Sequence, residues 1–261
     1  MSLKGKIALV TGSTSGIGLG IARALAAEGA DIMMNGFGDA AEIAALQGAM
    51  AAEFGVRVGH SGADIGQAEA CAAMVAAAQA ELGGLDILVN NAGVQFVAGI
   101  EDFPVAQWDR IVSINLSGAF YAMRAAIPAM RAKGWGRIIN IASAHGLVGS
   151  AQKSAYVAAK HGIVGLTKVA AIELANAGVT CNAICPGWVL TPLVEKQLAS
   201  RAAQDGTGIE TAMAAFLAEK QPMHQFSTPE QIGAAAVFLC SGGARTITGI
   251  SLSVDGGWVA E

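Results

Sequence analysis

Short apolar runs alternate with longer alanine-rich stretches along almost the whole chain. The apolar runs are rich in β-branched residues and are apolar throughout, which is typical of strands whose two faces are both covered. Runs of this kind predict seven strands, at 6–11, 31–35, 56–61, 85–90, 136–142, 179–185 and 251–254. The stretches between them predict helices at about 17–28, 40–54, 67–82, 105–132 and 154–177.

This order of strands and helices predicts one α/β domain over residues 1–261. Strands that alternate with helices form a parallel, doubly wound sheet of the Rossmann type, with helices on both faces. The segment from Thr191 to about Ser227 breaks the rhythm, because it has no strand and is more polar. We expect it to be a helical insertion, residues 191–227, that acts as a lid.

Composition excludes several classes of protein. Hydrophobic residues make up 53% of the 261 residues and charged residues only 14%, so a large core is expected and disorder is not. The net charge is −4 with no basic block, which argues against nucleic-acid and membrane-surface binding. With no signal-like or spanning segment and no Cys/His cluster of zinc spacing, we expect a cytoplasmic protein without a metal.

The stretch TGSTSGIG, residues 11–18, lies where the first strand turns into the first helix. Gly12, Gly16 and Gly18 let the backbone bend and approach a diphosphate, and the helix N-terminus supplies free N–H groups. A plain turn is the alternative, but the strand-to-helix position favours nucleotide binding.

The next strand end indicates which dinucleotide would bind. Residues 35–39 read NGFGD, and neither 13–20 nor 35–38 contains a Lys or Arg that would hold a 2′-phosphate, so NAD is favoured by exclusion. Phe37 is expected either to wall the adenosine pocket or to lie in the core. Asp64 is expected either to accept from the adenine amino group or to cap a helix.

Polar residues also follow the fourth and fifth strands. NNAG, residues 90–93, supplies two amides that can tie loops together at the crevice, or form a structural turn. Tyr156 and Lys160 are four residues apart on a predicted helix and share a face. An ammonium beside a tyrosine favours the tyrosinate, and Ser143 can donate to a substrate oxygen.

Together these features resemble the short-chain dehydrogenase/reductase family along essentially the full chain. The resemblance implies catalytic residues Asn115, Ser143, Tyr156 and Lys160, with Asn115 holding a water in a proton relay. It also implies a homotetramer and NAD as cofactor, although the usual aspartate is missing at Gly36–Phe37. The cofactor set it implies is Gly12, Thr14, Ser15, Gly16, Ile17, Gly18, Phe37, Asp64, Ile65, Asn91, Ala92, Gly93, Tyr156, Lys160, Pro186, Gly187, Val189 and Thr191.

Longer motifs, among them NNAGVQ, KSAYVAAKHG, CNAICPGWV and LSVDGGW, resemble the members that oxidise (R)-3-hydroxybutyrate to acetoacetate. A small 3-hydroxy acid needs cationic and amide donors near its reacting carbon. Lys153 could instead be a solvated lysine, and His145 a loop histidine bonded to backbone. The substrate set that the resemblance implies is Gln95, Ser143, His145, Lys153, Tyr156, Trp188, Gln197 and Trp258.

Two other functions stay open at this point. A 3-oxoacyl thioester reductase of the same family would prefer NADPH and a long substrate. A homologue that binds NAD without catalysis would need none of Asn115, Ser143, Tyr156 and Lys160.

Overall fold

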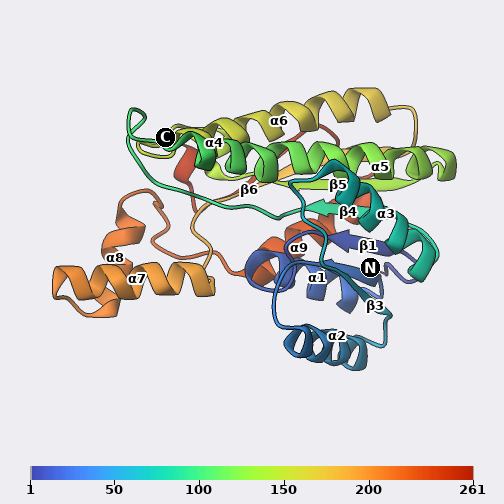
Figure 1. The fold of residues 1–261 in the computed structure, drawn as a ribbon, viewed down its shortest axis with the longest axis horizontal. Coiled ribbons are helices and arrows are strands. Elements are labelled where there is room, and N and C mark those ends of the chain that lie inside the picture. The colour runs from blue at the N-terminus through green and yellow to red at the C-terminus, as the bar shows by residue number, and fades with distance from the viewer. Residues whose placement is uncertain (1, 261) are drawn as a thin grey trace.

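The computed structural model describes residues 2–260, and of Leu193 only the backbone. Within this range seven parallel strands form one sheet in the order β3-β2-β1-β4-β5-β6-β7 (Figure 1). The sheet and the Rossmann-type arrangement are as predicted. The strands are β1 (Ile7–Val10), β2 (Asp31–Asn35), β3 (Val58–Ser61), β4 (Ile87–Asn90), β5 (Gly136–Ile141), β6 (Val179–Pro186) and β7 (Ser251–Val254).

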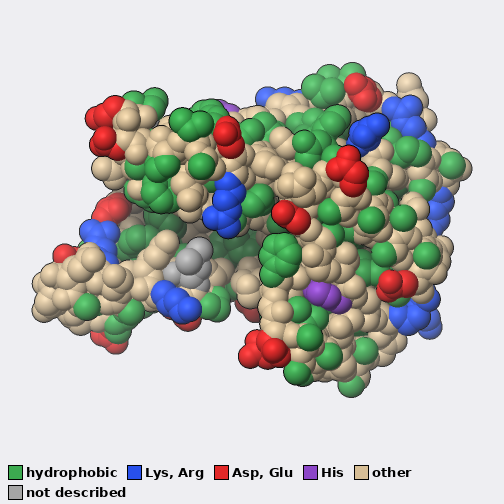
Figure 2. Space-filling model, viewed as in Figure 1, with side chains coloured by type: hydrophobic (Ala, Val, Ile, Leu, Met, Phe, Trp, Pro, Cys, Tyr) green, Lys and Arg blue, Asp and Glu red, His purple; other side chains and the backbone are tan. Residues whose placement is uncertain are grey.

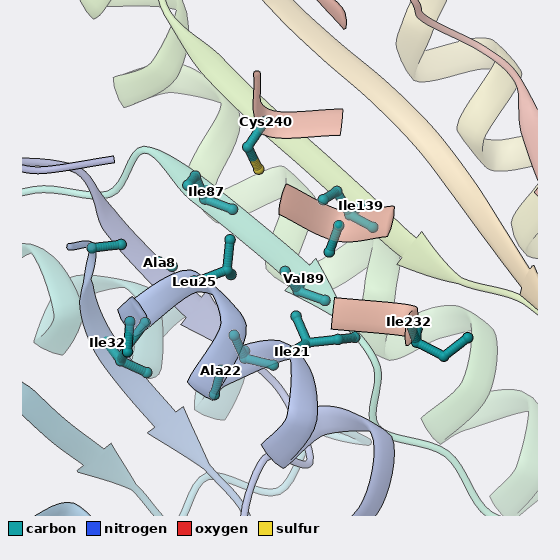
Figure 3. Packing of buried hydrophobic residues seen from close by; sticks show 14 of the residues in the cluster. Ala8, Ile21, Ala22, Leu25, Ile32, Ile87, Val89, Ile139, Ile232 and Cys240 are labelled. Carbon is teal, nitrogen blue, oxygen red and sulfur yellow. The ribbon is translucent and has the colours of Figure 1, made fainter. Parts of the chain in front are cut away.

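Helices cover both faces of this sheet. One layer holds α1 (Gly16–Ala27), α2 (Ala40–Phe54) and α9 (Pro229–Cys240), and the other α3 (Ala68–Leu82), α4 (Val105–Val112), α5 (Gly118–Lys133) and α6 (Ser154–Leu174). Figure 3 shows how Ile21 and Leu25 of α1 face Val89 of β4 beside Ile232 of α9. The strands are apolar on both sides because each side packs against a helix layer.

Helix α9 has no counterpart among the predicted elements. Its start carries a clear signal, because Thr228 and Gln231 form a capping box and Pro229 occupies the first turn. It crosses α1 at two glycines: a Cβ on Gly20 would lie 2.5 Å from the Cβ of Pro229, and one on Gly233 2.7 Å from that of Ala24. These glycines allow the two helices to pack closely.

The helical region expected at 105–132 is divided in three. A π-helical turn, η1 (Ser113–Ser117), separates α4 from α5. The amide of Asn115 in this turn bonds both backbone groups of Val94, accepting from N at 2.8 Å and donating to O at 2.9 Å. π-helical turns of this kind are frequent at functional sites.

The segment predicted as a lid forms two helices, α7 (Pro192–Asp205) and α8 (Ile209–Ala218), which project from the body of the molecule (Figure 1). Its two ends meet, because Val189 and Ser227 form a parallel bridge. Figure 2 shows a hollow between these helices and the rest of the chain. Among the helices described, none is long and apolar enough to cross a membrane.

Candidate active site

A cleft of about 590 Å³ opens at the carboxyl ends of the strands, on the side of α7. This is the size of a cavity that takes a cofactor or small ligand. All of the residues expected to bind cofactor line it except Val189. Val189 is buried in the core, and its backbone belongs to the bridge with Ser227.

The glycine-rich turn has the shape that a diphosphate needs. Gly12 has φ +62°, and a Cβ on it would lie 2.9 Å from the Cα of Ala92. A Cβ on Gly18 would lie 2.2 Å from the carbonyl oxygen of Gly12. Ser15, the N-cap of α1, makes no side-chain capping bond, so the first N–H groups of the helix stay open to an anion. The residues present therefore fit a dinucleotide.

The two asparagines of NNAG differ in what they do. Asn91 donates from Nδ2 to the Thr11 carbonyl at 2.8 Å, and its backbone N donates to Thr11 Oγ1 at 2.9 Å, which ties the loop to β1. Asn91 also lines the cleft. Asn90 is buried and donates to Asn140 Oδ1 at 2.8 Å, so the structural alternative holds for this residue.

At the far end of the cleft, Phe37 is 71% exposed and lies on the wall, so its alternative position in the core is wrong. Asp64 also lines the cleft, and its Oδ1 accepts from Gly66 N at 2.9 Å. The N-cap of α3 is Gln67, so Asp64 is not a helix cap. Arg110 of α4 lines the cleft as well, and the sequence carried no signal for it because it comes from a distant helix.

Ser143, Tyr156 and Lys160 come together at the inner end of the cleft. Ser143 follows β5, and Tyr156 and Lys160 lie on successive turns of α6. The Lys160 Nζ lies 5.6 Å from the centre of the Tyr156 ring and donates to the Ile141 carbonyl at 2.6 Å. Burial lowers the pKa of Lys160 to about 8. Burial raises the pKa of Tyr156, and a hydrogen bond with Ser143 opposes the rise.

Asn115 and Lys160 also line a second, much smaller cavity of about 10 Å³. This is about the space that one water molecule requires. Thr11 and Asn90 add polar groups to its wall. Asn115 and Lys160 therefore share the wall of a cavity that has room for about one water molecule.

Four of the residues expected to bind substrate form an aromatic and cationic cluster beside Tyr156. The His145 ring meets Tyr156 edge-on at 6.0 Å and Trp258 at 5.0 Å, and Trp258 is 5.3 Å from Trp188. The Lys153 Nζ lies 5.2 Å above the Trp188 ring. The cluster thus brings together residues from four separate segments.

Burial changes the ionisation of this cluster. Burial lowers the pKa of His145 to about 4, and the charge of Lys153 adds to the effect. His145 is therefore neutral at pH 7. Burial also lowers the pKa of Lys153, and the carboxylate of Glu219 opposes that change.

The two glutamines of the expected substrate set lie apart from the cluster. Gln95 is exposed and lines the cleft. Gln197 is exposed on α7, and among the described contacts none joins it to His145 or Lys153.

Two further residues shape the site, and the sequence alone does not predict their roles. Gln221 is buried, accepts from Trp188 N at 2.9 Å and bonds the Gln225 carbonyl. Asp255 accepts from the N–H groups of Gly257 and Val259, which holds Trp258 on its short helix η4 (Trp258–Ala260). Gln221 acts on the backbone of Trp188, which is distant in the chain, so no local pattern reveals it, whereas Asp255 forms a local turn. Within residues 2–260 there is no group of three or more His, Cys, Asp or Glu side chains placed to hold a metal ion.

Known proteins were compared with the chain. A family model described as enoyl-(acyl carrier protein) reductase matches residues 12–259. The chain is 61% identical to the D-beta-hydroxybutyrate dehydrogenase of Cupriavidus necator, with 99% of this chain and 100% of that protein covered. It is 55% identical to the D-beta-hydroxybutyrate dehydrogenase of Rhizobium meliloti, with 98% and 99% covered.

Among solved structures, the L-sorbose reductase of Gluconobacter frateurii, in complex with NADPH and L-sorbose, superposes with a TM-score of 0.95. The two sequences are 31% identical over 100% of this chain and 99% of that one. From the family match, the sequence identities and the shared fold together, the chain belongs to the short-chain dehydrogenase/reductase family.

Proposed function

We propose that the protein oxidises (R)-3-hydroxybutyrate to acetoacetate with NAD. The observation that carries the proposal is the position of Lys153 and His145 in one cluster with the Tyr156 ring. A hydroxyl that reacts at Tyr156 would have donors for a nearby carboxylate within the same cluster. The names of the two relatives that share 61% and 55% of its residues support the same substrate.

Lys153 and His145 are the donors proposed to recognise the acid. An ammonium that hydrogen-bonds a carboxylate makes one of the stronger hydrogen bonds in proteins, and the partial burial of Lys153 reduces competition from water. His145 is neutral and can still donate one N–H. Gln95 and Gln197 are proposed as further donors. Gln197 lies on α7, in the segment that is proposed to close over the acid as a lid.

The chemistry is proposed to centre on Ser143, Tyr156 and Lys160. Ser143 Oγ would donate to the oxygen on C3, and Tyr156, as tyrosinate, would take the hydroxyl proton. Lys160 would favour the tyrosinate by its charge. Asn115 would hold the water that links Lys160 to solvent. When bound, NAD supplies the acceptor for the hydride that leaves C3.

NAD is proposed rather than NADP because Thr14, Gly36 and Phe37 offer no cation to a 2′-phosphate where they line the cleft. Phe37 would lie against the adenosine and Asp64 near the adenine. The Phe37→Arg variant should bind NADP more tightly and NAD less tightly. Equal affinities in the wild-type protein would contradict the proposed preference.

A comparison of the acid with its methyl ester tests the role of Lys153. The ester keeps the carbon skeleton and the reacting hydroxyl but has no charge. In Lys153→Met the KM for the acid should rise about 10- to 100-fold, as expected for loss of a charged hydrogen bond, and the KM for the ester should rise much less. An equal rise for both would contradict carboxylate recognition.

A homotetramer in the cytoplasm is proposed as the working form. Few surface charges and exposed apolar side chains such as Ile172 and Val105 support association. All four cysteines are free thiols, which is usual for a reducing compartment.

A further inference from the structure

Six aromatic rings form a continuous row from the catalytic tyrosine to the projecting helices. The row begins with Tyr156, His145 and Trp258, which were described above. It continues from Trp188 to Phe216 of α8, whose ring centres are 4.3 Å apart, and from Phe216 to Phe226 at 6.2 Å. Phe216 thus makes the shortest ring contact that the structure gives for this row.

The residues of this row differ in how their backbones and side chains are held by hydrogen bonds. Trp188 is fixed at its backbone, since its N–H donates to Gln221 and its carbonyl accepts from Ser227 N at 2.9 Å. Trp258 is buried and is held through Asp255. The side chain of Trp188, by contrast, depends on its neighbours, because its buried Nε1 has no hydrogen-bond partner among the described residues.

Phe216 is the neighbour that comes from the α7–α8 pair. Arg201 of α7 bonds Glu219 at 2.8 Å, and its guanidinium lies 6.0 Å from the Phe216 ring. Phe216 is therefore held between Arg201 on one helix and Trp188 in the cluster. Arg201 and Glu219 are both partly exposed, so the pair is expected to orient α8 more than to stabilise the fold.

We infer that Phe216 is a positioning residue that backs Trp188 and so limits the substrate to a short alkyl chain. This inference rests on the proposed function. The carboxylate of the acid would face Lys153, with C3 at Tyr156. The alkyl group leaves C3 on the other side from the carboxylate, and we place it against the rings of Trp258 and Trp188. A chain longer than the C4 methyl would have to displace a ring, and close packing behind Trp188 prevents that. A pocket of this kind typically discriminates 10- to 200-fold per methylene.

The test is the ratio of kcat/KM for (R)-3-hydroxyhexanoate to that for (R)-3-hydroxybutyrate. In Phe216→Ala this ratio should rise at least about tenfold over wild type. Phe216→Tyr keeps a ring of the same shape and should restore the wild-type ratio. Phe216→Leu, a milder change, should give an intermediate ratio and keeps the test possible if the alanine variant does not fold.

A matched control lies on the same helix. Ile209 is exposed at the start of α8, so Ile209→Ala removes an apolar side chain from this helix without touching the row, and the ratio should not change. If the ratio is unchanged in both Phe216→Ala and Phe216→Leu while 3-hydroxybutyrate is still oxidised, the inference about Phe216 is overturned and the proposed function is not. If the wild-type protein does not oxidise 3-hydroxybutyrate, the proposed function fails and the inference fails with it.

Discussion

The catalytic assignment depends on one hydroxyl group, that of Tyr156. Tyr156→Phe removes this hydroxyl and keeps the ring that packs on His145. The rate of NADH formation should fall about 10²- to 10⁴-fold, the usual contribution of a general base. NAD affinity, measured by fluorescence titration, should change little. Turnover close to wild type would rule out the role given to Tyr156.

His145 makes stability depend on pH in a predictable direction. Its pKa is about 4 in the folded protein against an ordinary value of 6.5, because burial disfavours the charged ring. The unfolded chain therefore binds a proton between these values that the folded chain does not. The free energy of unfolding should fall as pH falls from 6.5 toward 4, by on the order of 2–3 kcal/mol from this residue.

Urea unfolding at pH 7.5 and pH 4.5 checks this expectation. His145→Asn lacks the titrating ring, so it should lose less stability than the wild type between the two pH values. Other acidic groups titrate equally in both proteins, so the difference between them isolates His145. The same loss in both would contradict the buried, neutral state of this ring.

Among the elements, the packing of α1 on α9 gives the sharpest prediction. A Cβ on Gly233 would lie 2.7 Å from Ala24 Cβ and 2.9 Å from the Gly20 carbonyl. Gly233→Ala should lower the free energy of unfolding by about 1–3 kcal/mol through overpacking. Gly48 in α2 has open space around it, so Gly48→Ala should be neutral or stabilising by up to about 1 kcal/mol. The free energy of unfolding, measured with urea, should therefore be lower in Gly233→Ala than in Gly48→Ala. Equal values for the two variants would contradict the close packing of α1 on α9.

The elements also show what the sequence could and could not predict. Strands such as 31–35 and 251–254 match β2 and β7 residue for residue, because each short run with apolar residues lies between glycines that form turns. Helix α9 was missed although its capping box was present, and the π-helical turn at Asn115 has no local signal. Phe216 and Gln221 act on Trp188, which is distant from both in the chain, so their contacts appear only once the chain is folded.

At the scale of the whole molecule, the prediction concerns assembly into a homotetramer. The helices α4, α5 and α6 lie side by side on one face of the sheet (Figure 1) and expose Val105, Phe120 and Ile172. Sedimentation equilibrium should give a mass about four times the 26.2 kDa of the chain. Ile172→Glu places a charge on the most exposed of these three side chains and should shift the protein toward smaller species. A monomer at all concentrations would contradict the proposed tetramer.

The most direct test of the whole account is NADH formation from the two enantiomers of 3-hydroxybutyrate, measured by fluorescence with NAD in excess. We predict rapid turnover of the (R) acid, little or none of the (S) acid, and none with NADPH and an acetoacetyl thioester. Inactivity with both acids, or a clear preference for the thioester, would contradict the proposed function.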